Sequence, residues 1–400
     1  MIKYIKSVLW GKSAFVLAPA MVLLLVAVPA VYTMAVNKVP ANTYADKYTG
    51  NAGNDGFAIS LSIANTGINT LAADPENPLV LKVQVRDGTG AAVPDVRVRL
   101  EASGENDLKF PGGCGTFRPS EGVTDAGGMF LTQYLPPASL NKASAENAVK
   151  LSAFLAGSDK SSSVNINLVP VPVVLVHGYQ ASPDIFSGLS EYLRQQGFYP
   201  VSVQYDSGKG VGAAAAELSV RLDRIKSGLE DAGVQVSRLD LVTHSMGGLA
   251  ARYYTCGNEY ASRGDIRKLV FVSVPHKGSP FASIGLHYYQ DASMTDMSTD
   301  SGLFTTVFPS MVNAGLNPSI ETGNILGLND EVVSLPNASL EDWNIKTEVF
   351  DLGGNNLSVD DLLSGEILKA ANHKLILYNK KVYRRIEEML ENPMPYPAMK

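Results

Sequence analysis

Two hydrophobic patterns divide the chain into a front and a rear region. Between Gly56 and Leu168, apolar and polar residues alternate with a period of two, which is typical of strands with one buried face. Turn sequences, D-G-T-G at Asp87–Gly90 and T-D-A-G-G at Thr124–Gly128, interrupt the alternation. We therefore expect a small all-β, antiparallel sandwich over residues 56–168. The clearest alternating positions are Leu81, Val83, Val85, Val96, Val98, Leu100, Val164, Ile166 and Leu168.

From residue 171 onward, continuous apolar runs alternate with helical periodicity. Val173–Val176 is apolar throughout, as expected of a strand buried on both faces. Leu269–Val274 is a second strand-like run, apolar except for Ser273. Between such runs, one helical face recurs at spacings of three and four. Strands that alternate with helices predict an α/β domain over residues 171–400, a mostly parallel sheet flanked by helices. The positions on that helical face are Leu218, Leu222, Ile225 and Leu229.

The candidate chemistry begins with the run L-V-T-H-S-M-G-G-L at Leu241–Leu249. It places Ser245 between an apolar strand and a helix, as in the nucleophile elbow of Ser-His-Asp hydrolases, whose motif is G-x-S-x-G. Gly247 and Gly248 would let the strand and helix approach closely. Thr243 departs from the motif, because it stands where the first glycine is expected. The pentapeptide alone is also compatible with an ordinary Gly/Ser turn.

A general base for this serine is sought among the histidines that follow it. In hydrolases with this elbow, the acid and then the histidine come after the serine along the chain. His276 lies too close to the elbow to leave room for an acid, and His287 lies in a polar, irregular stretch. His373 has room for a preceding strand and acid. The pattern therefore predicts His373 as the base.

Two aspartates compete for the role of the acid. Asp330 ends the run I-L-G-L-N-D, a short apolar strand followed by a polar turn. Asp351 lies one strand later and is the alternative. The position of the acid within this type of fold favours Asp330. The same fold predicts two backbone N–H donors for an oxyanion hole, Tyr179 after the strand ending in His-Gly, and Met246 after the serine.

The rear region resembles a known family. Residues Val171–Lys400 look like a bacterial lipase-type α/β-hydrolase of the class 2, or true-lipase, group. By that resemblance Ser245 is the nucleophile, His373 the general base and acid, and Asp330 the orienting carboxylate. The implied substrate is a lipid or another apolar ester. The matching pieces, in order, are V-L-V-H-G-Y, D-L-V-T-H-S-M-G-G-L, A-R-Y-Y, V-P-H-K-G-S-P, L-N-D-E-V-V and N-H-K-L-I-L-Y-N.

The front region resembles bacterial Ig-like domains of the invasin type. The pieces that carry this resemblance are V-Q-V-R-D-G-T-G-A-A-V-P-D-V-R-V and T-D-A-G-G-M-F. An Ig-like fold does not by itself define a function. We expect either a spacer or a module that binds a surface polymer or a protein partner.

Two segments of the rear region have no counterpart in the simple hydrolase pattern. Residues 281–326 mix aromatic residues and methionines with Gly, Ser and Asp, which favours a lid or a structural cap. Residues 353–371 contain Asp360, Asp361 and Glu366. Such an acidic segment either binds Ca²⁺ or is a solvated loop or short helix, and the sequence favours the solvated segment over a metal site. No other cofactor is expected.

The first 55 residues predict export. Lys3, Lys6 and Lys12 precede a charge-free stretch, Ala14–Val36, which is long enough to span a membrane. We expect residues 1–36 to be a signal anchor with a cytoplasmic N-terminus, or else a cleaved signal peptide. Residues 37–55 would be a tether. The hydrolase would then work at the cell surface or in the periplasm, or be secreted after cleavage.

Composition narrows the classes of function. The net charge of −6 and the lack of basic runs argue against nucleic-acid binding. The two cysteines, Cys114 and Cys256, fall in different predicted domains and are expected to be thiols rather than an inter-domain disulfide. Three functions remain: a carboxylic ester hydrolase, an acyltransferase or amidase that uses the same triad, and a non-catalytic adhesin that works through the Ig-like domain.

Overall fold

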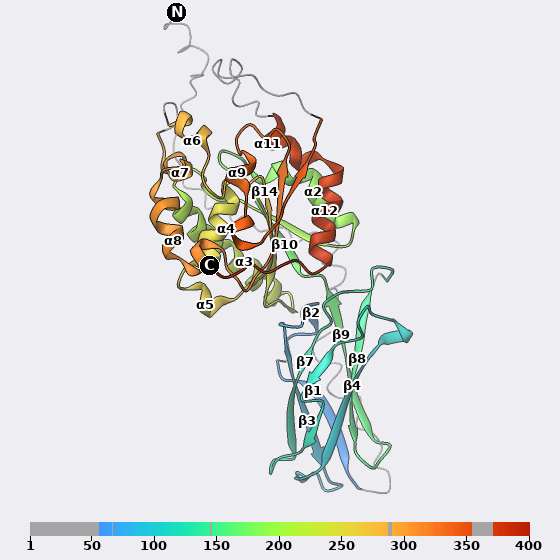
Figure 1. Ribbon diagram of the computed structural model, residues 1–400. Helices are drawn as coiled ribbons and strands as arrows, with labels where there is room; N and C mark the ends of the chain where they lie inside the picture. The colour runs from blue at the N-terminus through green and yellow to red at the C-terminus, as the bar shows by residue number, and fades with distance from the viewer. Residues whose placement is uncertain (1–55, 66, 145, 287–289, 354–370) are drawn as a thin grey trace, which may run out of the picture. The chain divides into compact units, whose positions relative to one another are not determined.

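The computed structural model describes residues 56–65, 67–144, 146–286, 290–353 and 371–400 (Figure 1). The expected membrane segment, the tether and the acidic residues Asp360, Asp361 and Glu366 lie outside the described residues. In the described part of the chain, no helix combines the length and apolar character needed to cross a membrane. Those same ranges contain no group of three or more His, Cys, Asp or Glu residues that could hold a metal ion.

The front region is a sandwich of two sheets that share one core. One sheet is antiparallel, with the order β1-β3-β7-β5, and the other has the order β12-β2-β9-β8-β4-β6. The strands of the first sheet are β1 (Ala58–Ile63), β3 (Leu79–Arg86), β7 (Met129–Leu135) and β5 (Thr116–Arg118). Those of the second are β2 (Thr70–Ala72), β9 (Ser161–Val169), β8 (Asn147–Leu155), β4 (Arg97–Gly104), β6 (Glu121–Val123) and β12 (Val234–Gln235). A 3₁₀ turn, η1 (Glu105–Asp107), follows β4.

The alternation in the sequence explains this core. Leu81, Val83 and Val85 on β3 are fully buried, whereas the residues between them point away from the core. The predicted sandwich is therefore confirmed. The expectation that it is antiparallel throughout was wrong at one edge, because β2 runs parallel to β9 and β12 runs parallel to β2. β12 comes from the rear region, so period-two patterning in the front region could not reveal this pairing.

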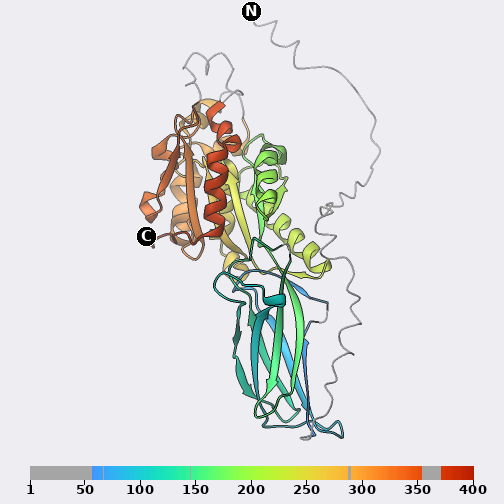
Figure 2. The same ribbon diagram turned by 90° about the vertical axis from the view of Figure 1, so that its right-hand side faces the viewer.

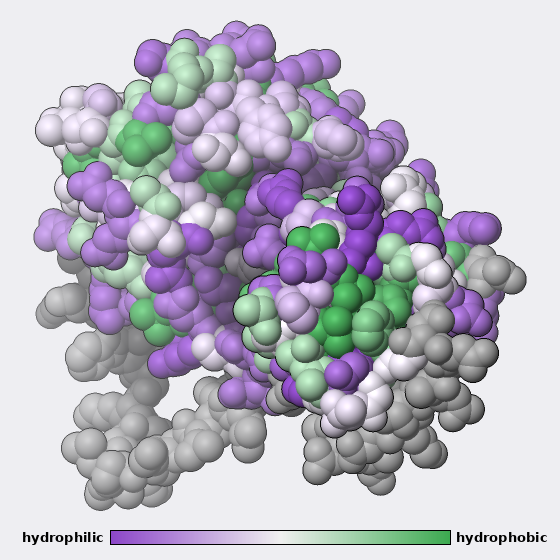
Figure 3. All heavy atoms as spheres, turned by 90° about the horizontal axis from the view of Figure 1, so that it is seen from below, coloured by the Kyte–Doolittle hydropathy of each residue, from purple (hydrophilic) through white to green (hydrophobic). Residues whose placement is uncertain are grey.

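The end of the sandwich seen in Figure 3 carries an apolar patch. Figure 3 looks onto the end of the sandwich and shows apolar side chains gathered in one patch among polar ones. The connection from β3 to β4 contributes exposed Ala91 and Ala92 and half-buried Val93 to the apolar surface of the domain.

Tyr134 is the largest aromatic side chain buried in the sandwich core, and its hydroxyl donates to the Cys114 carbonyl over 2.6 Å. Cys114 and Cys256 are both free thiols, as expected.

The rear region contains a six-stranded sheet in which every pair of neighbours is parallel, in the order β11-β10-β13-β14-β15-β16. This confirms the predicted α/β architecture. Its strands are β10 (Pro172–Val176), β11 (Tyr199–Val203), β13 (Leu239–His244), β14 (Ile266–Val272), β15 (Glu321–Gly327) and β16 (Thr347–Phe350).

Helices cover both faces of this sheet, as the side view shows (Figure 2). Val174 and Val176 of β10 pack into the core on one face, and Val173 and Leu175 pack into the core on the other. Both faces of the strand are buried, which is why its sequence is continuously apolar. The first face is covered by α3 (Val211–Asp231), α4 (Met246–Cys256) and α5 (Tyr260–Arg263), and the second by α2 (Ser187–Gln195) and α12 (Lys380–Glu391).

The insertion after β14 is a cap of short helices. Met294, Met297, Leu303 and Phe308 are buried in the same core as α3 and α4. The insertion ends earlier than the sequence suggested, because residues 321–326 belong to β15. Its elements are α6 (Pro280–Gly285), α7 (Ala292–Met297), the π-helical turn η3 (Leu303–Val307), α8 (Phe308–Ser310) and η4 (Val312–Gly315). The other short helices among the described residues of the rear region are η2 (Pro183–Phe186), α9 (Leu335–Ala338), η5 (Glu341–Trp343), α11 (Ala371–Leu375) and η7 (Ile376–Tyr378).

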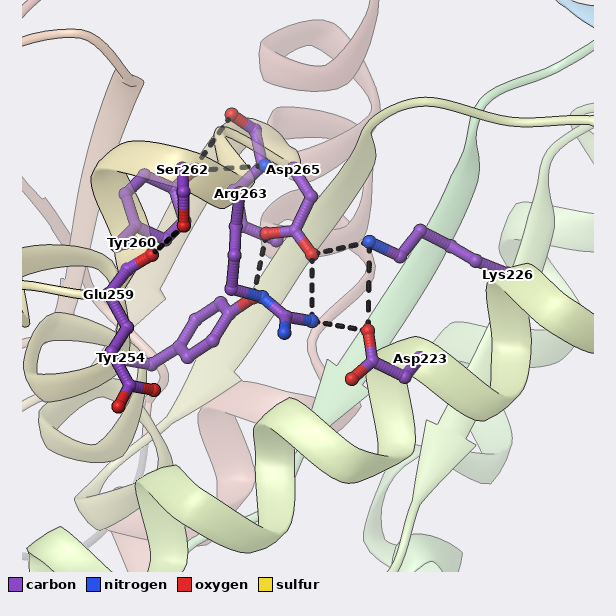
Figure 4. A network of polar contacts seen from close by, with 9 residues as sticks. Asp223, Lys226, Tyr254, Glu259, Tyr260, Ser262, Arg263 and Asp265 are labelled. Atoms are coloured by element: carbon purple, nitrogen blue, oxygen red, sulfur yellow. Dashed lines mark hydrogen bonds and ion pairs between the residues drawn. The ribbon is translucent and has the colours of Figure 1, made fainter.

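A polar network ties helices together at the amino ends of the parallel strands (Figure 4). Asp265, which precedes β14 and is 1% exposed, accepts hydrogen bonds from Lys226 of α3 (2.6 Å) and Tyr254 of α4 (2.7 Å). Arg263 of α5 donates to the same tyrosine hydroxyl over 2.8 Å and pairs with Asp223 of α3. A buried carboxylate with this many donors is well satisfied. The network is therefore structural and lies at the opposite end of the sheet from Ser245.

Candidate active site

Ser245 lies on a sharp turn between β13 and α4, as its motif predicts. Its backbone has φ 52° and ψ −128°, a conformation that a non-glycine residue adopts only under strain. Thr243 fits the strand, where its side chain is buried and its hydroxyl lies 3.4 Å from the Val270 carbonyl oxygen. The missing first glycine of the motif therefore does not prevent the turn.

The two glycines after the serine are required by close packing. A Cβ atom on Gly247 would lie 2.4 Å from the His177 carbonyl oxygen and 2.6 Å from that of Val176. A Cβ atom on Gly248 would lie 2.3 Å from a methyl group of Val274. All three distances are shorter than such atoms can approach. The glycines allow α4 to begin directly against the carboxyl ends of β10 and β14.

The structure brings Ser245, His373 and Asp330 together. The Nε2 atom of His373 lies 2.9 Å from Oγ of Ser245. Its Nδ1 atom lies 2.9 Å and 3.0 Å from the two carboxylate oxygens of Asp330. Because a carboxylate only accepts, Nδ1 carries the proton and Nε2 is left to accept from the serine hydroxyl. Ser245 and His373 are each 6% exposed, so water has little access to either.

The surroundings of Asp330 favour the ionised form of its carboxyl group. Its side chain is fully buried, and its oxygen Oδ1 accepts the N–H groups of Val332 (3.0 Å) and Val333 (2.9 Å). Burial raises the pKa of this carboxyl, but the charge of His373 and the hydrogen bonds from His373 and Val333 lower it by more, so that the pKa lies below its usual range. The charged form is therefore favoured beside the imidazole.

The other candidate residues lie elsewhere. Asp351, the alternative acid, lies in an exposed turn after β16, where its carboxylate accepts the N–H of Gly353 over 2.9 Å. His276 is buried beside Arg252, whose guanidinium donates to the His276 carbonyl over 2.8 Å. Burial, and then the charge of Arg252, lower the pKa of His276 well below its usual value. His287 lies outside the described residues.

Of the two predicted oxyanion donors, Met246 follows Ser245 directly in the chain, and Tyr179 lies in the loop after β10 that passes beside the serine. Met246 is the first residue of α4, a position whose N–H has no acceptor within the helix. The loop after β10 passes directly beside the nucleophile, since a Cβ on Gly178 would lie 2.8 Å from Cβ of Ser245. Tyr179 follows in this loop, and its hydroxyl donates to Asp291 at the start of cap helix α7. This hydrogen bond connects the cap to the loop after β10 that carries Tyr179.

Sequence reasoning missed two residues that contact the triad. Glu331 accepts a hydrogen bond from the backbone N–H of His373 over 3.0 Å. Nε2 of His244 lies 2.8 Å from the carbonyl oxygen of the same residue. Each is adjacent in sequence to a triad member, Glu331 to Asp330 and His244 to Ser245. That adjacency was a usable signal, but it did not reveal that both side chains converge on the third member.

Comparison with models of known protein families finds no match, and a search of curated proteins finds no significant match either. Among solved structures, the chain is similar to mature lipase BlEst2 from Bacillus licheniformis, with 14% identity and a TM-score of 0.43 over 55% of this chain and 91% of that one. Lipase B from Aspergillus fumigatus shares 14% identity, with a TM-score of 0.41 over 56% of this chain and 54% of that one. The D00-D0 domain of intimin shares 13%, with a TM-score of 0.23 over 30% of this chain and 50% of that domain. All three scores are low, so an assignment of function depends on the geometry of the site itself.

Proposed function

We propose that the chain is a serine hydrolase that cleaves carboxylic esters through an acyl-enzyme formed on Ser245. The observation that carries this proposal is the continuous relay of hydrogen bonds from Ser245 Oγ through both ring nitrogens of His373 to Asp330. A serine hydroxyl is a weak nucleophile until a base removes its proton, and this relay supplies such a base in the correct tautomer.

Each step of the reaction follows from that relay. Oγ of Ser245 attacks the ester carbonyl carbon while Nε2 of His373 takes the hydroxyl proton. The tetrahedral intermediate collapses when the bond to the alcohol oxygen breaks, and that oxygen receives the proton from Nε2. Water then attacks the acyl-serine with the same base, which releases the carboxylic acid and restores Ser245. Asp330 holds the ring and stabilises the imidazolium without being protonated.

The negative oxygen of the tetrahedral intermediate requires donors. We assign this role to the backbone N–H groups of Met246, which follows Ser245 at the start of α4, and of Tyr179, which follows Gly178 in the loop beside Ser245. Donors that are already in place stabilise charge that appears only in the transition state, by about 3 kcal/mol each. The start of α4 adds the positive end of its helix dipole at the same position.

The proposed substrate class is an ester with an apolar acyl group, such as a lipid. Ser245 is nearly closed off from water, and Met246, next to it, is fully buried in the apolar core. The cap adds further apolar side chains to this core. An apolar acyl chain would exchange water for such surroundings, which is favourable. We also propose that the enzyme acts outside the cytoplasm, on the basis of the charge-free stretch Ala14–Val36.

The test is hydrolysis of p-nitrophenyl esters of increasing chain length by the full chain, beside the Ser245→Ala variant. We expect turnover that is lost in the variant and that increases with acyl length. Added alcohol and amine acceptors separate hydrolysis from acyl transfer, because a transferase would convert the acyl-enzyme into new esters or amides. Absence of turnover on every ester, with or without acceptors, would contradict the proposal and favour a binding role for the sandwich.

A further inference from the structure

His373 is held by its main chain as well as by its ring. Its N–H donates to Oε2 of Glu331 over 3.0 Å, and its carbonyl oxygen lies 2.8 Å from Nε2 of His244. We propose that Glu331 and His244 are positioning residues, which hold the two peptide groups of His373 so that its imidazole meets Ser245 in the reactive geometry. This inference rests on the proposed serine hydrolase function.

The Glu331 side of this arrangement is built from three consecutive residues. The carbonyl of Asn329 accepts from the side chain of Asn372 (3.0 Å), and the carboxylate of Asp330 accepts from the ring of His373. The second oxygen of Glu331 accepts from the N–H of Asn372 (2.9 Å). The turn that carries the acid therefore also holds the backbone of the base. Both Glu331 oxygens bind backbone N–H groups rather than the imidazole, which distinguishes Glu331 from the acid itself.

The His244 side depends on an imidazole that stays neutral. A carbonyl oxygen only accepts, so Nε2 of His244 carries the proton, and Nδ1 is unprotonated and has no partner among the described residues. Burial, and then repulsion by His373, lower the pKa of His244 to about 3. Its ring lies against that of His373, with 4.7 Å between the centroids. A neutral donor can hold the His373 carbonyl without competing for the proton that the reaction moves.

External contacts matter because the ring of His373 must stay within reach of Ser245 and Asp330. Both backbone groups of His373 are bound by side chains from other elements, its N–H by Glu331 and its carbonyl by His244. A displacement of the base by about 1 Å is enough to cost roughly 100-fold in rate. Glu331 and His244 act on opposite ends of one residue, so together they limit both translation and rotation of His373.

The first test compares Glu331→Gln with wild type in ester hydrolysis by the full chain. One amide oxygen replaces two carboxylate oxygens, so one backbone N–H loses its acceptor. We expect kcat to fall about 10- to 100-fold with KM within twofold, because the base and not the substrate is displaced. Glu348→Gln is the matched control, since Glu348 also uses both oxygens, for the guanidinium of Arg385 at 2.7 Å each. A kcat within twofold of wild type for Glu331→Gln, or an equal loss in both variants, would overturn the Glu331 assignment.

The second test separates hydrogen bonding from packing at position 244. His244→Gln keeps an N–H donor at similar reach, whereas His244→Leu keeps bulk without a donor. We expect His244→Leu to lose at least about tenfold in kcat and His244→Gln to recover most of that loss. Equal activity of the two variants would overturn the His244 assignment. In a His373→Ala background, neither Glu331→Gln nor His244→Leu is expected to lower the residual rate further, because residues that act through His373 are not additive with it.

A third measurement does not depend on turnover. The chain has five histidines, so ¹⁵N-histidine labelling gives a countable set of ring signals, and His373→Gln identifies those of the base. We expect Glu331→Gln to shift the His373 signals and Glu348→Gln to leave them in place. If Glu331→Gln shifts the His373 signals but the wild-type protein hydrolyses no ester, the positioning role is retained and the proposed function is rejected. Ester turnover by the wild-type protein, together with unshifted His373 signals and unchanged kcat in Glu331→Gln, would retain the proposed function and reject the positioning role. Should Glu331→Gln fail to fold, Glu331→Asp, which retains both oxygens on a shorter arm, is measured in the same way.

Discussion

Asp330 and His373 are 43 residues apart in the chain, yet both carboxylate oxygens of Asp330 lie within 3.0 Å of Nδ1 of His373. This contact joins the turn after β15 to helix α11. It selects the imidazole tautomer whose free nitrogen faces Ser245. The alternative acid, Asp351, is exposed and bonds only within its own turn among the contacts described.

Replacing Asp330 by Asn tests this contact. Asparagine is nearly isosteric, but it offers one acceptor oxygen and an NH₂ group, so the His373 tautomer is no longer enforced. We expect kcat for ester hydrolysis to fall by about 10⁴-fold, the order found when this carboxylate is replaced in a Ser-His-Asp triad. The measurement is steady-state kinetics beside Asp351→Asn, which should retain wild-type activity. Similar losses in the two variants would contradict the assignment of Asp330.

Gly247→Ala tests the close approach of α4 to the sheet. The new Cβ would lie within 2.6 Å of two backbone carbonyl oxygens, neither of which can rotate away. We expect a loss of about 3 kcal/mol in the free energy of unfolding, together with most of the activity, because the elbow must move. Gly228→Ala in α3 is the control, since its Cβ meets nothing within 4 Å and alanine favours a helix by about 0.5–1 kcal/mol. Urea unfolding measures both, and equal stability of the two variants would refute the steric argument.

The stability of the protein should fall on acidification. Burial lowers the pKa values of His177, His244 and His276 below their ordinary 6.5, so the folded protein binds fewer protons than the unfolded chain below that pH. Each histidine that stays neutral in the folded protein then lowers the free energy of unfolding by about 1.4 kcal/mol per pH unit below 6.5. This loss is absent above pH 6.5. His244→Gln should reduce the slope of unfolding free energy against pH by one such increment between pH 6 and 4. A free energy of unfolding that does not change between pH 7 and 5 would contradict this prediction.

Arg252 is a buried cation bound by carbonyl groups. It is 1% exposed and donates to Gly315 and His276 over 2.8 Å, while its guanidinium carbon lies 4.1 Å from the centre of the Phe308 ring. Burial lowers its pKa to about 10. Arg252→Lys should lower the free energy of unfolding, measured in urea, by about 2–4 kcal/mol. A single ammonium group cannot replace the several N–H donors of the planar guanidinium.

The control for Arg252 is Arg385→Lys. Arg385 pairs with Glu348 at the surface, where its side chain is 36% exposed, so the expected loss is below about 1 kcal/mol. A smaller loss for Arg252→Lys than for Arg385→Lys would show that the buried guanidinium is not holding the cap turn at Gly315.

Local patterns were sufficient to predict the architecture. The alternation around Leu81 and the continuous run at Val173 each depend on which faces of a strand are buried. The buried faces can be read from the polarity of consecutive residues. The position of Ser245 between an apolar strand and a glycine-rich helix start is equally local. Chain order then led to His373 and Asp330, because a fold with this elbow leaves few places for an acid and a base.

The remaining features depend on residues that are distant in the chain. Neither the pairing of β12 with β2 nor the early end of the cap at β15 follows from the periodicity of those segments. The pattern of residues alone was enough to predict the two fold classes and a short list of candidate residues for the site. Contacts in the folded chain distinguish Asp330 from Asp351, and folding alone brings Glu331 and His244 to the two peptide groups of His373. Burial patterns are local and repeat along the chain, whereas a hydrogen bond between distant residues exists only once the strands and turns that carry them have packed.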